Sequence, residues 1–179
     1  MTTFDQLTAR RRSVREYDAT RSVARDELEQ LVAAALEAPT WKNSETGRYH
    51  LVCSPEMKAR LAQCLAPQNQ PRAEGCGALI VTTFVKNRSG FNRDGLPDNE
   101  LGNGWGIYDL GLQNAYLLLK AADLGLDTLV IGLRDADAIR QLLQLPDEET
   151  VVSVIVVGHR KNEPQRPPRK NLTDVAHFY

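Results

Sequence analysis

The residues best suited to chemistry in this sequence are the arginines near its N-terminus. The stretch Arg10-Arg11-Arg12-Ser13-Val14-Arg15 places four guanidinium groups and one hydroxyl within six residues. A guanidinium group is planar, permanently charged and shaped to bind phosphate or carboxylate through paired hydrogen bonds. The stretch therefore predicts a binding site for an anion.

A second basic group lies near the C-terminus, and it consists of Arg160, Lys161, Arg166, Arg169 and Lys170. The whole chain has 22 basic and 23 acidic residues and a net charge of −1. That balance argues against a general nucleic-acid binder, because such proteins carry a strong positive excess. The two basic groups could converge on one phosphate-bearing ligand. For either group alone, a solvated face or a nucleic-acid arm stays open as the alternative.

The chain lacks the common signatures of side-chain catalysis, namely G-x-S-x-G, H-E-x-x-H, the P-loop and G-x-G-x-x-G. Its histidines are interpreted as surface or structural residues: His50, His159 and His177. Its cysteines lack the spacing of a zinc site and are interpreted as reduced thiols: Cys53, Cys64 and Cys76. We expect no metal site. A protein without an evident acid, base or nucleophile commonly obtains its chemistry from an organic cofactor.

The elements that must position these residues alternate in a pattern typical of one α+β domain over residues 1–179. Helices are predicted from a capping box at Thr3 towards Arg11, and over residues 25–38, 54–65, 105–124 and 135–143. Ser54 and Asp135 are the expected N-caps of two of them. Strands are predicted over residues 48–53, 78–85, 127–132 and 151–157. We expect one mixed sheet flanked by helices and an extended C-terminal tail over residues 159–179.

The helix predicted over residues 105–124 is the most apolar element of the chain, with apolar residues on more than one face. We expect it to be buried on several sides, as a core helix or as part of a subunit interface. The polar stretch 88–103 before it is interpreted as a surface excursion or a lid. No stretch approaches the length of a membrane span, and no secretory signal is apparent, so we expect a cytoplasmic protein.

Five motifs, in order along nearly the whole chain, resemble the nitroreductase family of flavin-dependent oxidoreductases. They are R-R-S-V-R at 11–15, A-P-T-W-K-N-S at 38–44, D-L-G-L-Q-N-A at 109–115 with A-A-D-L-G-L at 121–126, V-V-G-H at 156–159 and R-K-N-L at 169–172. One departure is Glu45, which stands where the family loop usually has glutamine. The resemblance implies a nitroreductase-like fold.

The resemblance also implies a non-covalently bound FMN at the interface of a homodimer, with each flavin site shared between the subunits and the long core helix at that interface. By position, the phosphate, ribityl chain and pyrimidine edge would be held by Arg11, Arg12, Ser13 and Arg15. A second phosphate clamp would be Arg169. The ribityl or pyrimidine groups would also bind Gln68 and Asn69.

The same resemblance places two further segments next to the isoalloxazine ring. The other subunit would border the ring with Pro39, Thr40, Trp41 and Asn43. A backbone N–H near the flavin N5 atom would come from the turn Val130, Ile131 and Gly132. The aromatic residues Trp41, Trp105 and Tyr108 are open to two interpretations, as packing or as the substrate side of the site.

The implied activity is a ping-pong reaction in which NAD(P)H reduces the flavin at N5 and a small electron-poor acceptor reoxidises it. Nitroaromatics, quinones and enones are the acceptor classes, and no catalytic side chain is required. Two alternatives stay open. One is a flavoenzyme of the same scaffold with an oxidase or dehalogenase reaction, and the other is a non-catalytic module that binds a polyanion. Neither a nucleic acid nor a membrane is expected as a partner of the enzyme.

Overall fold

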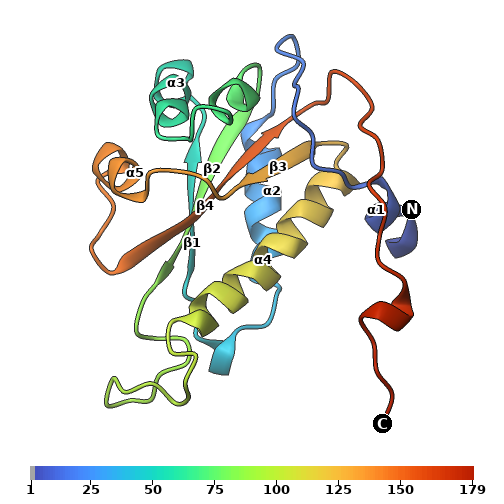
Figure 1. Ribbon diagram of the computed structural model, residues 1–179. Coiled ribbons are helices and arrows are strands. Elements are labelled where there is room, and N and C mark those ends of the chain that lie inside the picture. The colour runs from blue at the N-terminus through green and yellow to red at the C-terminus, as the bar shows by residue number, and fades with distance from the viewer. Residues whose placement is uncertain (1–2) are drawn as a thin grey trace.

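The computed structural model describes residues 3–179, which form a four-stranded sheet with helices on both faces (Figure 1). The strands are β1 (Gly47–Val52), β2 (Ala78–Val85), β3 (Asp127–Ile131) and β4 (Glu149–Gly158), in the order β1-β2-β4-β3. The predicted α+β class is confirmed. The sheet differs from the expected mixed one because its three pairings are all antiparallel, and parallel pairing is confined to a bridge between Ser13 and Thr128.

The described residues form five α-helices. They are α1 (Phe4–Arg10), α2 (Arg25–Leu36), α3 (Pro55–Gln63), α4 (Gly104–Asp123) and α5 (Ala136–Leu143). The predicted N-terminal caps are confirmed: Thr3 forms a capping box with Gln6, and the side chains of Ser54 and Asp135 accept backbone hydrogen bonds at α3 and α5. Because these polar side chains satisfy otherwise free N–H groups, they define where each helix begins.

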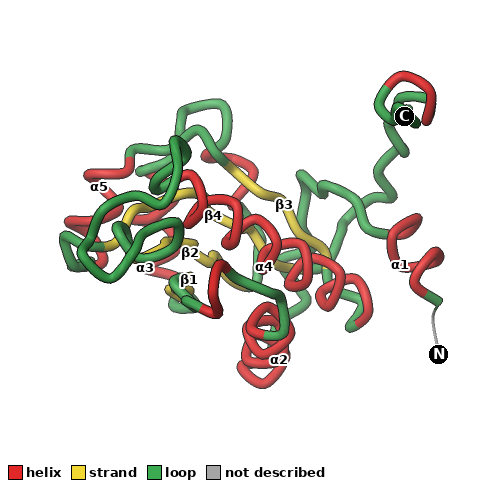
Figure 2. The backbone as a smooth tube through the Cα atoms, turned by 90° about the horizontal axis from the view of Figure 1, so that it is seen from below, coloured by secondary structure: helices red, strands yellow, loops and turns green. Residues whose placement is uncertain are grey.

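Helices α2 and α4 cover one face of the sheet, and α3 and α5 cover the other (Figures 1 and 2). Strand β2 contributes side chains to the packing on both faces of the sheet. Its Ala78 and Ile80 pack with α2 and α4, whereas Leu79 and Val81 pack with α3 and α5. A strand buried on both faces favours apolar residues, which explains the largely apolar sequence of β2. Its two polar residues, Thr82 and Thr83, are buried and hydrogen-bonded to Ser153 and Glu149.

Helix α4 buries one face of its surface within the chain. Its buried residues include Leu110, Leu117 and Ala121, while Ile107 and Tyr108 are 50% and 58% exposed on the other side. The burial expected on several sides is therefore limited in one chain to the side that packs on the sheet and α2. The outer side of α4 is an apolar surface open to solvent.

The N-terminal helix and the C-terminal tail lie together, beyond the end of α4 that is formed by residues near Asp123 (Figures 1 and 2). The tail is extended as predicted, apart from the short 3₁₀ turn Leu172–Asp174. Within residues 3–179, no helix is long and apolar enough to cross a membrane.

The three thiols are free and differ in exposure, so we expect them to react in a fixed order. Cys53 is exposed, Cys64 is half-buried and Cys76 is buried; burial raises the pKa of both the Cys64 and Cys76 thiols. Because the thiolate is the reactive form, an aromatic disulfide reagent should modify Cys53 first and Cys76 only after unfolding. A Cys53→Ser variant should lose the fast phase, and a fast phase that persisted in it would contradict this order.

Candidate functional site

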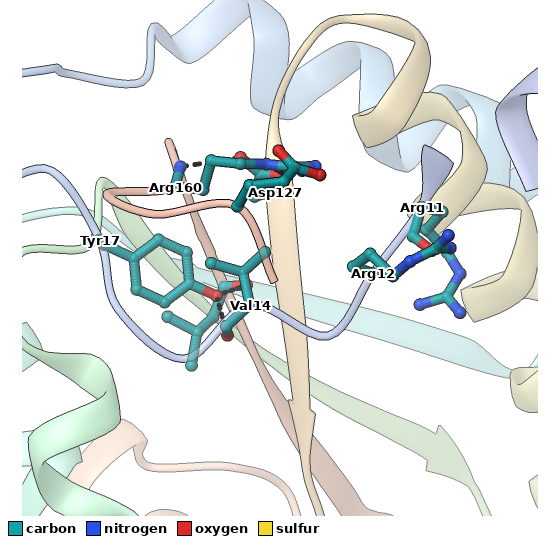
Figure 3. A network of polar contacts seen from close by, with 8 residues as sticks. Arg11, Arg12, Val14, Tyr17, Asp127 and Arg160 are labelled. Carbon is teal, nitrogen blue, oxygen red and sulfur yellow. Dashed lines mark hydrogen bonds and ion pairs between the residues drawn. The ribbon is translucent and has the colours of Figure 1, made fainter. Parts of the chain in front are cut away.

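The arginine stretch is anchored to the edge of the sheet by the residues that follow it. The Val14 N–H donates to the Thr128 carbonyl of β3 at 3.0 Å, and the buried Tyr17 hydroxyl donates to the Val14 carbonyl at 3.1 Å. Val14 is 2% exposed and belongs to the core that α3 and α5 cover. The segment is therefore fixed by an apolar anchor, and its arginines extend from the edge of β3 (Figure 3).

The C-terminal tail is fixed next to this segment by Arg160. Its guanidinium group donates to Asp127 Oδ1 from Nε at 2.9 Å and from Nη2 at 2.6 Å, and its backbone N–H donates to Asp127 Oδ2 at 2.7 Å. The pKa of Arg160 is raised, chiefly by its hydrogen bonds to Asp127. Beyond it, the Lys161 N–H donates to the Glu16 carbonyl at 3.1 Å. The tail thus starts beside residues 13–17 (Figure 3).

The two basic groups meet at Arg12. The pKa of Arg12 is lowered by partial desolvation and then by the charges of Arg166, Arg11 and Arg169. Within residues 3–179, none of these four guanidinium groups forms an ion pair with a carboxylate. The charge of Glu163 opposes them in part. The remaining excess of cations at one place creates a positive potential that a multiply charged anion can relieve.

The other residues predicted for the arginine side of the site have different surroundings. Arg15 is exposed and donates to the Ser13 carbonyl at 3.3 Å, and Arg169 donates to the Pro167 and Pro168 carbonyls. Arg166 was not among the predicted site residues, because it lies outside the motif that contains Arg169. Its place in the basic C-terminal group was the only signal for it in the sequence.

The turn after β3 and the loop with Gln68 and Asn69 are neighbours. Leu65 and Arg134 form a bridge, and the Ala66 N–H donates to the Leu133 carbonyl at 3.1 Å. At the turn, Val130 and Gly132 are exposed, whereas Ile131 is 3% exposed and its side chain belongs to the core. The side chain of Ile131 is therefore not available to a site at this edge.

The loop with Pro39, Thr40, Trp41 and Asn43 lies at the opposite end of α4. The Trp41 N–H donates to Asp109 Oδ2 at 2.9 Å, near the start of the helix, whereas α1 packs near its end. At a rise of about 1.5 Å per residue, the helix from Asp109 to Asp123 spans about 21 Å. Within one chain the structure therefore does not bring this loop to the arginines.

The backbone of this loop has unusual conformations. Lys42, Asn43 and Glu45 have φ values of 47°, 55° and 47°, in the left-handed region that favours glycine. Next to it, the rings of Trp41 and Trp105 lie 4.4 Å apart, and those of Trp105 and Tyr108 lie 5.5 Å apart. Non-glycine residues held in such conformations tend to gather at binding and catalytic sites.

The histidines have the structural or surface surroundings expected of them. His50 Nε2 lies 2.7 Å from Glu149 Oε2, His159 Nε2 donates to the Ser22 carbonyl at 3.2 Å, and His177 is exposed in the tail. Among the described residues, no group of three or more His, Cys, Asp or Glu side chains could hold a metal ion.

Comparison with known proteins gives consistent results. The model of the nitroreductase family matches residues 8–159. An FMN reductase (NAD(P)H) of Bacillus subtilis is 26% identical over 93% of this chain and 69% of its own length. The enone reductase of conjugated linoleic acid (CLA) biosynthesis from Lactiplantibacillus plantarum is 33% identical over 70 residues; the match spans 39% of this chain and about a third (32%) of that relative.

The fold also matches solved structures. A protein from Exiguobacterium sibiricum described as a nitroreductase in complex with FMN superposes with a TM-score of 0.87, at 24% identity, over 100% of this chain and 98% of the other. At this level of identity the likeness concerns the fold. It agrees with the α+β architecture predicted from the sequence.

Proposed function

Since this chain belongs to the nitroreductase family, we propose that it is an FMN-dependent oxidoreductase that uses NAD(P)H to reduce a small electron-poor acceptor. The observation that carries the cofactor assignment is the gathering of Arg11, Arg12, Arg166 and Arg169, whose charges add to partial desolvation in lowering the Arg12 pKa. A phosphate monoester carries close to two negative charges at neutral pH, which suits several guanidinium groups. The FMN of the matching structure and the name of the FMN reductase relative support the same cofactor.

In this proposal Arg11, Arg12 and Arg169 bind the phosphate, and Arg166, from the same tail, adds to the positive potential. Ser13 and Arg15 bind the ribityl chain and the pyrimidine edge. A cation near that edge stabilises the negative charge of the reduced flavin, so the exposed Arg15 favours reduction. Gln68 and Asn69 bind from the loop that lies against the turn after β3.

FMN, when bound, supplies the N5 atom that accepts hydride from a reduced nicotinamide and passes the electrons on to the acceptor. The chain's task is orientation, which requires no acidic or basic side chain. In this proposal the segment Val130, Ile131 and Gly132 supplies a backbone N–H at the end of β3, and a Cβ built at Gly132 meets nothing within 4 Å. That open space lets a planar ring approach the backbone closely.

A complete site requires a second copy of the chain, and we propose a homodimer. The loop 39–43 is about 21 Å along α4 from the arginine end, so it borders the flavin of the partner. The apolar outer side of α4, with Ile107, Tyr108 and Tyr116 exposed, is the contact surface in this proposal. Gly111 supports this choice, because a Cβ there meets nothing within 4 Å of its own chain. Glycine in a helix interior costs about 1 kcal/mol relative to alanine, so a close approach by another chain is a reason for it.

The test of the proposed function is the flavin itself. The purified protein should be yellow or should take up FMN, and Arg12→Ala or Arg169→Ala should each raise the Kd for FMN roughly tenfold to a hundredfold, the effect of one charge-assisted hydrogen bond. Arg60→Ala, which removes an exposed arginine of α3 remote from this cluster, is the matched control and should leave the Kd unchanged. Fluorescence quenching of added FMN measures all of these values.

Uptake of FMN distinguishes the proposed enzyme from a module that binds polyanions. A colourless protein that takes up no FMN, but binds nucleic acid with an affinity that falls steeply with salt, would contradict it. The acceptor class is then read from reoxidation of the reduced protein by a nitroaromatic, a quinone and an enone. An acceptor of the enone type is favoured by the partial match to the enone reductase.

A further inference from the structure

Asp109 is a buried carboxylate at a position where the core of the protein would accept an apolar residue. It is 2% exposed, on the side of α4 that faces the sheet. Its Oδ2 atom accepts hydrogen bonds from the Trp41 backbone N–H, at 2.9 Å, and from the hydroxyl of Ser89, which is 1% exposed. Burial of a carboxylate is costly unless such bonds compensate it, so these two bonds are the reason for its presence.

The two donors come from different loops. Trp41 belongs to the loop of residues 39–45, and Ser89 belongs to the excursion of residues 88–103. The loops also meet through the ion pair of Lys42 Nζ and Asp98 Oδ2, at 2.7 Å. On the helix side, the Trp105 indole N–H donates to Asn99 Oδ1 of the excursion at 2.9 Å, while its ring packs on Trp41.

The loop 39–45 requires an external anchor to keep its shape. Directly after Trp41, Lys42 and Asn43 both have left-handed backbone conformations, which non-glycine residues retain only where the surroundings hold them. Trp41 Nε1 and Ser44 Oγ are buried and have no hydrogen-bond partner within the described residues, so these side-chain atoms do not hold the loop. Within the loop, the Asn43 and Ser44 N–H groups donate to the Thr40 and Trp41 carbonyls, and the Glu45 N–H donates to Thr40 Oγ1. None of these internal bonds fixes the loop relative to α4, whereas the bond from the Trp41 N–H to Asp109 does.

We propose that Asp109 is a positioning residue that locks the loop 39–45 and the excursion 88–103 into one unit, and so fixes the aromatic wall of Trp41, Trp105 and Tyr108. The locking follows from the contacts of a single chain. That the wall borders the acceptor side of the partner's flavin rests on the function proposed above. Asp109 does not touch the reacting groups, and its effect on the reaction passes through the position of Trp41.

The two tryptophans provide a direct readout, because Trp41 and Trp105 are the only ones in the chain. Their rings lie 4.4 Å apart at an angle of 48°, a geometry that couples their electronic transitions and gives an exciton couplet in circular dichroism. The couplet depends on the relative position of the two rings and does not require flavin. A Trp105→Phe variant defines the spectrum without it.

In the purified full-length protein, Asp109→Ala should reduce the couplet at least twofold. Asp109→Asn should keep most of it, because the amide oxygen can occupy the position of Oδ2. Ser89→Ala removes one of the two bonds and should have an intermediate effect, and it provides the measurement if Asp109→Ala fails to fold. The matched control is Ser153→Ala, which removes a buried hydroxyl bonded to Thr82 inside the sheet and should leave the couplet unchanged.

A couplet of wild-type amplitude in both Asp109→Ala and Ser89→Ala would overturn the proposal, and so would equal losses in Asp109→Ala and Asp109→Asn. In the flavin-loaded protein, displacement of the wall should raise the KM for a quinone roughly tenfold, since small misplacements are costly, while the rate of flavin reduction stays within about twofold. Loss of the couplet without a change in KM would uphold the lock and contradict the placement of the wall at the flavin. Absence of flavin binding would contradict the proposed function alone.

Discussion

Gly111→Arg is expected to give a folded monomer that does not retain FMN. Within one chain the substitution is harmless, because a Cβ at this position meets nothing within 4 Å, and arginine is the better helix former by about 1 kcal/mol. In the proposed dimer, the same side chain places bulk and a charge between Ile107, Tyr108 and the second copy of α4. Light scattering and the visible absorbance of flavin measure the two losses together.

The Gly111→Arg monomer should be as stable to heat as the wild-type chain is when its dimer has dissociated. Gln141→Arg is the control, because it adds an arginine to the exposed surface of α5, on the other face of the sheet. It should remain a yellow dimer. A Gly111→Arg protein that is dimeric and binds FMN would place the interface elsewhere.

Arg160→Ala is expected to lower the free energy of unfolding by about 3 kcal/mol, because it leaves a buried carboxylate without its cation. Asp127 is only 7% exposed at its side chain, and Arg160 binds it through two guanidinium nitrogens. The tail that holds Arg166 and Arg169 also loses the guanidinium part of its anchor and keeps only the backbone bonds of residues 160 and 161. We therefore expect weaker FMN binding in addition to lower stability, although Arg160 itself is not assigned a contact with the phosphate.

Urea denaturation measures the first effect and FMN titration the second. The control is Arg25→Ala, which breaks an ion pair with Glu29 between side chains that are 92% and 58% exposed. Exposed pairs of this kind within a helix contribute about 0.5 kcal/mol or less, so this variant should unfold nearly as the wild type does. Equal losses in the two variants would show that the Asp127 pair is no stronger than a surface pair.

The helices and strands were largely predictable because their signals are local. Strand β2 (Ala78–Val85) has the predicted bounds, since a largely apolar run is typical of a strand that is covered on both faces. Helix α5 begins after Asp135, as predicted, because that side chain accepts the N–H of Ala138. The antiparallel order of the sheet was not predictable in the same way. It depends on which strands pair across long stretches of chain.

The candidate site was likewise predictable only in part. The types of its residues were evident from the sequence, since the motifs at 11–15 and 169–172 contain the guanidinium groups that a phosphate requires. The contribution of Arg166 was missed, because nothing local distinguishes it from other tail arginines. Asp109 was noticed only as part of a helix motif, and its bonds to Trp41 and Ser89 join three segments of the chain.

The sequence by itself determined the α+β class, the bounds of most elements, the family and the dense group of arginines in the N-terminal stretch, for which anion binding stays a prediction. Only the tertiary structure decided that Arg12 lies with Arg166 and Arg169, and that the loop 39–43 lies at the far end of α4. The physical reason is the distance along the sequence over which each kind of interaction acts. Caps, turns and hydrophobic periodicity act over a few residues and are written in the local sequence. The meeting of distant cations depends instead on how the whole core packs, and on one buried ion pair that fixes the tail to β3.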